Sequence, residues 1–150
     1  MINEQPFPDQ ITIGGAPDSA AIEDLKARGF TTIINLRTPD EPNYAQEESE
    51  VEGAGLDYAA IPISPTLIDD IAVARFSGAV TSSAGPVAVH CKGGGRAGVM
   101  SLLHLAVTHG WSLEHALEEG ERLGVKIAAD SPYRQFFESY IQRHSAGERA

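Results

Sequence analysis

The chain has a single cysteine, and none of its apolar runs approaches the roughly 20 residues that a membrane-spanning helix needs. One cysteine excludes an internal disulfide, which fits a reducing compartment. The first residues have neither the basic start nor the apolar stretch of a signal peptide. We therefore expect a cytoplasmic protein with no membrane span.

Basic residues are scarce as well. The 11 lysines and arginines stand against 21 aspartates and glutamates, and the formal net charge is −10. This surplus disfavours binding to nucleic acid or to acidic membrane surfaces, so a site for anions must be a local exception. The 150 residues, 42% of them hydrophobic, suffice for one core. We expect one domain over 1–150, with a core at about 11–142 and a frayed tail from about 145.

The most informative stretch is VAVHCKGGGRAG, at 87–98. Apolar residues lead into a histidine and the cysteine, three glycines and an arginine follow, and an apolar helical pattern begins at Val99. This order predicts a strand, a tight loop and a helix, with Cys91 at the end of the strand. Backbone N–H groups at a helix N-terminus form an anion site, because unpaired donors and the helix dipole point the same way.

Strand-like and helix-like segments alternate along the rest of the chain. Strands are expected at 11–13, 31–36 and 56–63 and before Cys91, and helices after Asp18 or Ser19, Asn43, Asp69 or Asp70, Ser112 and Ser131. The alternation predicts an α/β fold, in which a mostly parallel sheet of about four to five strands is flanked by helices. We interpret 11–13 as an edge strand, Asn43 with Gln46 as a capping box, and the acidic residues from Glu47 to Glu52 as a solvated helix face.

The loop residues suit nucleophilic chemistry on an anionic substrate. A thiol is a good nucleophile only as its thiolate, which loop amides and Arg96 can stabilise. The same donors would bind a phosphate dianion, and the planar guanidinium can hold two of its oxygens. We predict that Cys91 attacks a phosphoryl group and that water hydrolyses the resulting phosphocysteine. The predicted site residues are Cys91 and Arg96 for catalysis, and Lys92, Gly93, Gly94, Gly95 and Arg96 for phosphate binding, although Lys92 could instead face solvent.

The motif HCKGGGRAG, at 90–98, resembles the signature loop of cysteine-dependent dual-specificity and tyrosine phosphatases. The resemblance extends to flanking segments and covers roughly 11–141; these segments are 11–17, 29–37, 55–62 and 110–112. It implies a phosphatase-like fold and a phosphatase that needs neither metal nor cofactor. Cys91 is then the nucleophile, and the partner is a phosphorylated protein or a small phosphorylated molecule, such as phosphotyrosine or a related phosphomonoester.

The chain departs from this family's pattern in three places. Four residues separate Cys91 from Arg96, where the family usually has five, although some bacterial members have the shorter loop. Ala97 stands where a serine or threonine usually helps the thiolate to leave, which implies slow hydrolysis of the intermediate. Ser64 stands at the place of the general-acid aspartate. The alternatives for the acid are Asp69, Asp70, Asp40 and Glu41, or none.

Two other functions remain open on the sequence. Sulfurtransferases of the rhodanese type carry a persulfide on cysteine and commonly have four residues between cysteine and arginine, as here; the histidine at 90 argues against this reading. A phosphate-binding module without turnover would fit Ala97 and the missing aspartate. We expect His90 to orient the loop by hydrogen bonding. The sequence leaves the particular substrate and the oligomeric state undetermined.

Overall fold

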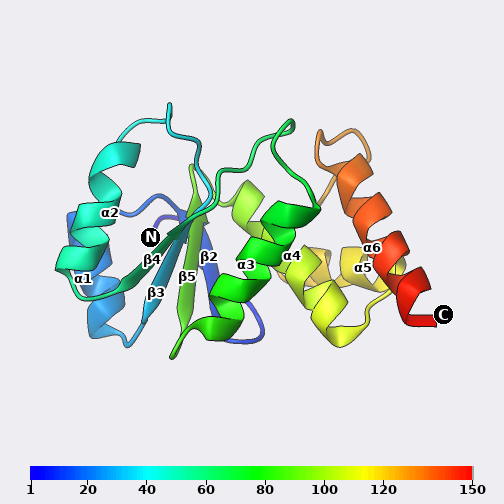
Figure 1. Ribbon diagram of the computed structural model, residues 1–150, viewed down its shortest axis with the longest axis horizontal. Helices are drawn as coiled ribbons and strands as arrows, with labels where there is room; N and C mark the ends of the chain where they lie inside the picture. Colours follow the sequence, from blue (N-terminus) through cyan, green and yellow to red (C-terminus); the bar gives the residue numbers. More distant parts are fainter. Residues whose placement is uncertain (150) are drawn as a thin grey trace.

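The computed structural model describes the backbone of residues 1–149 and the side chains of residues 1–144. Its centre is a five-stranded sheet with the order β1-β2-β5-β3-β4 (Figure 1). The strands are β1 (Gln5–Pro6), β2 (Ile11–Gly15), β3 (Thr32–Asn35), β4 (Asp57–Ala60) and β5 (Val87–Cys91). The helices are α1 (Ser19–Ala27), α2 (Tyr44–Gly53), α3 (Asp70–Ser82), α4 (Gly95–His109), α5 (Leu113–Arg122) and α6 (Arg134–Arg149).

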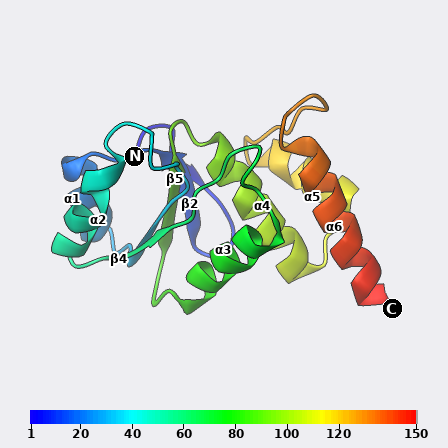
Figure 2. The same cartoon turned by 45° about the horizontal axis from the view of Figure 1, so that its top comes forward.

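The sheet is parallel except for the short β1, which pairs antiparallel with β2. Helices α1 and α2 cover one face, and α3 and α4 cover the other (Figure 1). Helices α5 and α6 pack on the side of α4 that faces away from the sheet (Figure 2). The expected α/β fold with a mostly parallel sheet is confirmed.

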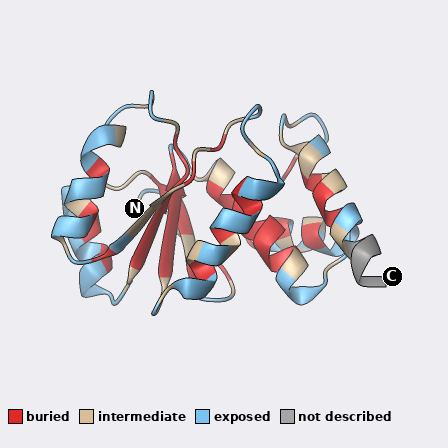
Figure 3. Ribbon diagram, viewed as in Figure 1, coloured by how far each residue is buried: buried red, intermediate tan, exposed pale blue. Residues whose placement is uncertain are grey.

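The two elements that carry the signature loop are deeply buried. Every residue of β5 is buried, and β5 lies between β2 and β3. Ten residues of α4 are buried between the sheet and the outer helices, which Figure 3 shows as a red band. The loop between β5 and α4 is therefore anchored at both ends in the main hydrophobic core.

Three expected helix caps form as the sequence predicts. The side chains of Asp18 and Asp69 each accept a backbone N–H three residues on, at 2.8 Å, and Ser112 does the same at 3.1 Å. Each bond satisfies a donor that the first helical turn leaves unpaired, which is worth about 1 kcal/mol. These caps fix where α1, α3 and α5 begin.

Two local predictions are wrong. The strand at 11–13 is not at the edge of the sheet, because Gln5 and Pro6 form β1 beside it. The capping box at the start of α2 does not form: Asn43 has φ of 63° and makes no side-chain bond to the helix backbone. Its carboxamide oxygen instead accepts a long 3.4 Å contact from the Gln46 side chain.

Helix α6 continues to Arg149, past the point from which the sequence predicts a frayed tail, and residue 150 lies outside the described chain. The expected domain limits stay a prediction. None of the helices in the described part of the chain is long and apolar enough to cross a membrane.

Candidate active site

Cys91 lies at the carboxyl end of β5, buried with 2% of its surface exposed. The backbone N–H of Gly94 donates a hydrogen bond to its Sγ at 3.1 Å. Gly94 has φ of 105°, a left-handed conformation that favours a residue without a Cβ. Helix α4 begins at the next residue. The predicted order of strand, tight loop and helix is therefore observed.

Arg96 lies in the first turn of α4. Its side chain is held by the loop that follows β3 and by the loop that follows β4. Its Nη1 and Nη2 donate to the two carboxylate oxygens of Glu41 at 2.8 and 2.7 Å, and Nη1 also donates to the carbonyl of Ile63 at 3.1 Å. A guanidinium has five N–H groups, so Nε–H and one Nη2–H remain on one edge. Two N–H groups on one edge match two oxygens of a phosphate.

The contact with Arg96 keeps the Glu41 carboxyl group ionised. The hydrogen bonds from Arg96, helped by the backbone N–H of Thr38 at 2.6 Å, lower the pKa of Glu41 to about 2. The same contact raises the pKa of Arg96 above its ordinary value. Near neutral pH, Glu41 is therefore a carboxylate that holds Arg96 and has no proton to give.

Cys91 and Arg96 open into a cavity of about 830 Å³. One wall is the signature loop, from which Gly93, Gly94 and Gly95 line the cavity. Residues of the connection between α5 and α6 also line the cavity, and so do residues 3–5. The loops that follow β3 and β4 contact Arg96, and the α5–α6 connection lies at the same end of the molecule (Figures 1 and 2). The side chain of Lys92 is exposed and does not line this cavity, so its contact with phosphate stays a prediction.

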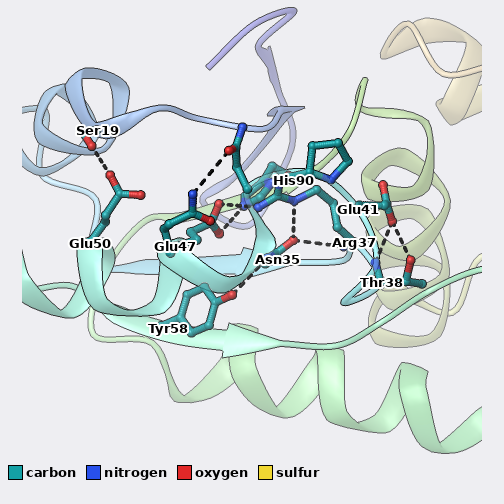
Figure 4. A network of polar contacts seen from close by, with 12 residues as sticks. Ser19, Asn35, Arg37, Thr38, Glu41, Glu47, Glu50, Tyr58 and His90 are labelled. Carbon is teal, nitrogen blue, oxygen red and sulfur yellow. Dashed lines mark hydrogen bonds and ion pairs between the residues drawn. The ribbon is translucent and has the colours of Figure 1, made fainter.

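A buried polar cluster lies behind the loop (Figure 4). Glu47 of α2 is 2% exposed and accepts from Arg37 Nη2 at 3.0 Å, while its other oxygen lies 2.6 Å from Nε2 of His90. Arg37 also donates to the Pro42 carbonyl at 2.7 Å and to Asn35 Oδ1 at 3.2 Å. The interpretation of Glu47 as part of a solvated helix face is wrong. A buried arginine after β3 needs an anion, and Glu47 lies on the inner face of α2, four residues before buried Val51.

His90 makes its hydrogen bond away from the loop. The bond to Glu47 ties the end of β5 to α2, while Nδ1 of the ring has no partner among the described residues. No hydrogen bond from His90 to the loop occurs among the described residues, so its role in orienting the loop stays a prediction. The contact joins residues 43 positions apart in the chain.

The four acidic candidates for a general acid lie in different surroundings. Asp69 caps α3, Asp70 pairs with Arg143 at 2.7 Å, and Asp40 contacts the Thr38 hydroxyl. Glu41 is the one of the four that contacts a predicted catalytic residue. No group of three or more histidine, cysteine, aspartate or glutamate side chains suited to a metal ion occurs among the described residues.

Tyr133 is a cavity residue that the sequence does not indicate. It lies in the α5–α6 connection and lines the cavity with Cys91 and Arg96. Its position depends on how α5 and α6 pack on α4, and no local pattern encodes that packing. A tyrosine just before an amphipathic helix otherwise predicts a core contact.

The phosphatase-like domain of the beta-lactamase hydrolase-like proteins matches residues 7–117 of this chain. The chain belongs to this family. One relative, the beta-lactamase hydrolase-like protein of Agrobacterium fabrum, is 40% identical over a 93-residue alignment, and the match covers 59% of this chain and 22% of that protein. The phosphatase-like domain thus spans about a fifth of the length of this curated relative.

Solved structures of phosphatases share the fold of this phosphatase-like domain. A putative phosphatase from Shewanella putrefaciens has a TM-score of 0.74 at 21% identity, covering 98% of this chain and 93% of its own. TpbA of P. aeruginosa, in a complex with phosphotyrosine, has a TM-score of 0.75 at 18% identity, covering 97% of this chain and 90% of its own. The expected phosphatase-like fold is confirmed.

Proposed function

We propose that this phosphatase-like domain hydrolyses phosphate monoesters through a phosphocysteine on Cys91, with phosphotyrosine or a similar aryl phosphate as substrate. The observation that carries the proposal is the pairing, in one cavity, of a cysteine thiol with an arginine whose edge offers two N–H groups. The family supports phosphatase chemistry, and the phosphotyrosine bound to TpbA supports the substrate class.

The chemistry needs two displacements at phosphorus. In the first, the Cys91 thiolate forms an S–P bond as the bond from phosphorus to the leaving oxygen breaks. Arg96 and the loop amides hold the other phosphoryl oxygens and stabilise the charge that develops on them. In the second, water attacks phosphorus, the S–P bond breaks, and the thiolate leaves with its electron pair. Inorganic phosphate is released, and the proton of the attacking water passes to solvent.

The leaving group in this scheme departs without help from a carboxylic acid. Glu41 is ionised and bonded to Arg96, and Asp69 and Asp70 are engaged elsewhere. A phenolate leaves far more readily than an alkoxide, so aryl phosphates should react faster than phosphoserine or an inositol phosphate. This is the physical reason for preferring phosphotyrosine within the range of monoesters. Because no acid must stay protonated, kcat/KM should not fall between about pH 6 and pH 8.

The decisive experiment measures phosphate release from an aryl phosphate, a phosphotyrosine peptide, a phosphoserine peptide and an inositol phosphate. The wild type should turn over the aryl substrates fastest, and Cys91→Ser should lose turnover while still binding inorganic phosphate in calorimetry. Lys92→Ala tests the remaining loop residue, and should weaken phosphate binding if its side chain turns toward the ligand. Wild-type turnover in Cys91→Ser would overturn the mechanism.

Sulfur transfer is a second candidate, favoured by the four-residue span from Cys91 to Arg96 and by buried Ala97, which places no hydroxyl beside the loop. Here the Cys91 thiolate would attack the outer sulfur of thiosulfate. The S–S bond breaks, sulfite leaves, and a persulfide remains, which cyanide converts to thiocyanate and free thiolate. Thiocyanate production without phosphate release would replace the phosphatase proposal. Phosphate binding with neither reaction over several hours would instead indicate a binding module.

A further inference from the structure

The α5–α6 connection forms a wall of the cavity that the signature loop also lines. Two of its cavity-lining residues, Ser131 and Tyr133, carry hydroxyl groups. The Ser131 hydroxyl accepts the backbone N–H of Tyr133 at 3.2 Å and so belongs to the turn before α6. The phenol hydroxyl of Tyr133 has no hydrogen-bond partner among the side chains and backbone that the structure describes. The Tyr133 phenol is therefore the hydroxyl on this wall that takes no part in the turn.

The connection holds the backbone of Tyr133 in a defined place. Arg134 donates to the Ile127 carbonyl at 2.6 Å and to Glu138 at 2.6 Å, which closes the connection on itself. The Tyr133 carbonyl accepts the N–H of Phe137 at 3.0 Å in the first turn of α6. A ligand therefore does not have to order the backbone that carries this phenol.

Charges at the catalytic centre act on this phenol. Partial burial raises the pKa of Tyr133, Arg96 opposes this shift, and the negative charges of Cys91 and Glu41 add to it. Tyr133, Cys91 and Arg96 all line the same cavity, which is consistent with this influence on the phenol. Since its pKa lies above the usual value, it remains a protonated donor through the neutral range.

We propose that Tyr133 is a further substrate-contacting residue, whose phenol hydroxyl donates a hydrogen bond to a non-bridging oxygen of the phosphoryl group held by Arg96. Tyr133 lines the same cavity as Cys91, Arg96 and the loop glycines, so a phosphoryl group held by the loop occupies a cavity that this side chain also borders. The inference rests on the proposed function, because it concerns the same cavity. It adds a donor from outside the loop, at a position that the loop motif does not specify.

The test compares Tyr133→Phe with the wild type, using an aryl phosphate and inorganic phosphate. The variant keeps the ring and removes the hydroxyl alone. A hydrogen bond to a charged oxygen is strong enough that kcat/KM should fall by about tenfold or more, and the Kd of inorganic phosphate should rise in the same direction. Tyr140→Phe is the matched control. Tyr140 is a buried tyrosine of α6 that does not line the cavity, so both quantities should stay within about twofold of the wild type.

Three outcomes would overturn the inference. The first is a Tyr133→Phe variant with wild-type kcat/KM and phosphate Kd. The second is an equal loss in Tyr140→Phe, which would assign the effect to stability. The third is loss only in Tyr133→Ala, with Tyr133→Phe unaffected, which would give the role to the ring. If the wild type releases no phosphate from any monoester, the proposed function fails, and the phosphate Kd values of wild type and Tyr133→Phe still decide on Tyr133.

Discussion

Glu41 and Arg96 form a two-point ion pair, with Nη1–Oε2 and Nη2–Oε1 distances of 2.8 and 2.7 Å, and Arg96 lines the cavity that also contains Cys91. The pair uses the end of the guanidinium and leaves its Nε edge for a ligand. Glu41 is itself fixed by the backbone N–H of Thr38 at 2.6 Å. We therefore regard Glu41 as the residue that positions Arg96.

Glu41→Ala should lower kcat/KM for an aryl phosphate by about tenfold or more, because Arg96 loses the partner that aims its edge and small misplacements are costly in catalysis. The pH profile decides between this role and that of a general acid. With its pKa at about 2, Glu41 gives no falling limb above pH 5, so the variant and the wild type should have profiles of the same shape. A falling limb that disappears in Glu41→Ala would contradict the positioning role. Asp40→Ala, at an exposed neighbour that does not contact Arg96, is the control.

The same carboxylate should contribute to stability in a pH-dependent way. The pKa of Glu41 falls from 4.5 to about 2 on folding, so its stabilising effect is complete above 4.5 and disappears as pH falls toward 2. Glu41→Gln should therefore be less stable than the wild type at about pH 6, and this difference should shrink at about pH 3. Urea unfolding at both pH values measures it, with Glu48→Gln, at an exposed position of α2, as the control. A difference that is constant with pH would contradict the assignment.

Removal of Glu47 should be one of the most damaging single changes in the protein. Glu47→Ala leaves Arg37 buried without its anion and removes the partner of His90, and breaking a buried pair from one side costs about 3–5 kcal/mol. Glu48→Ala, one residue away and exposed, should change the unfolding free energy by no more than about 0.5 kcal/mol. Chemical denaturation of the two variants provides the comparison, and equal small effects would show that Glu47 is not needed by the cluster.

Gly98→Ala tests whether the α5–α6 connection, which lines the cavity, depends on close packing against α4. A Cβ at this position would lie 2.7 and 2.8 Å from the two Cγ atoms of Val125, and valine is too short to move aside without its backbone. We expect a loss of about 1–3 kcal/mol in stability and a higher KM, because the α5–α6 connection shifts. Gly78→Ala is the control: nothing lies within 4 Å of its Cβ, so the change should stabilise α3 by up to about 1 kcal/mol. If Gly98→Ala keeps wild-type stability and KM, the wall does not depend on this contact.

Much of the fold can be predicted from local sequence because its signals are local. Apolar runs mark the buried strands, and Asp18, Asp69 and Ser112 mark helix starts that form as expected. The sequence does not predict β1, because its two residues are too few to show a periodic pattern. The burial of Glu47 can be predicted in part, because a residue four positions before buried Val51 lies on the same face of the helix. Its charge favours a solvated face instead.

By itself, the sequence determined the site's central element: a cysteine at a strand end, glycines around it and an arginine in the first turn of the next helix. These features lie within six consecutive residues, so backbone geometry alone brings them together. The tertiary structure alone decided which groups surround them. Glu41 meets Arg96 across 55 positions and Glu47 meets His90 across 43, while Tyr133 reaches the cavity only because α5 and α6 pack on α4. Contacts of this range depend on how helices and sheet pack together, and no local propensity specifies that packing.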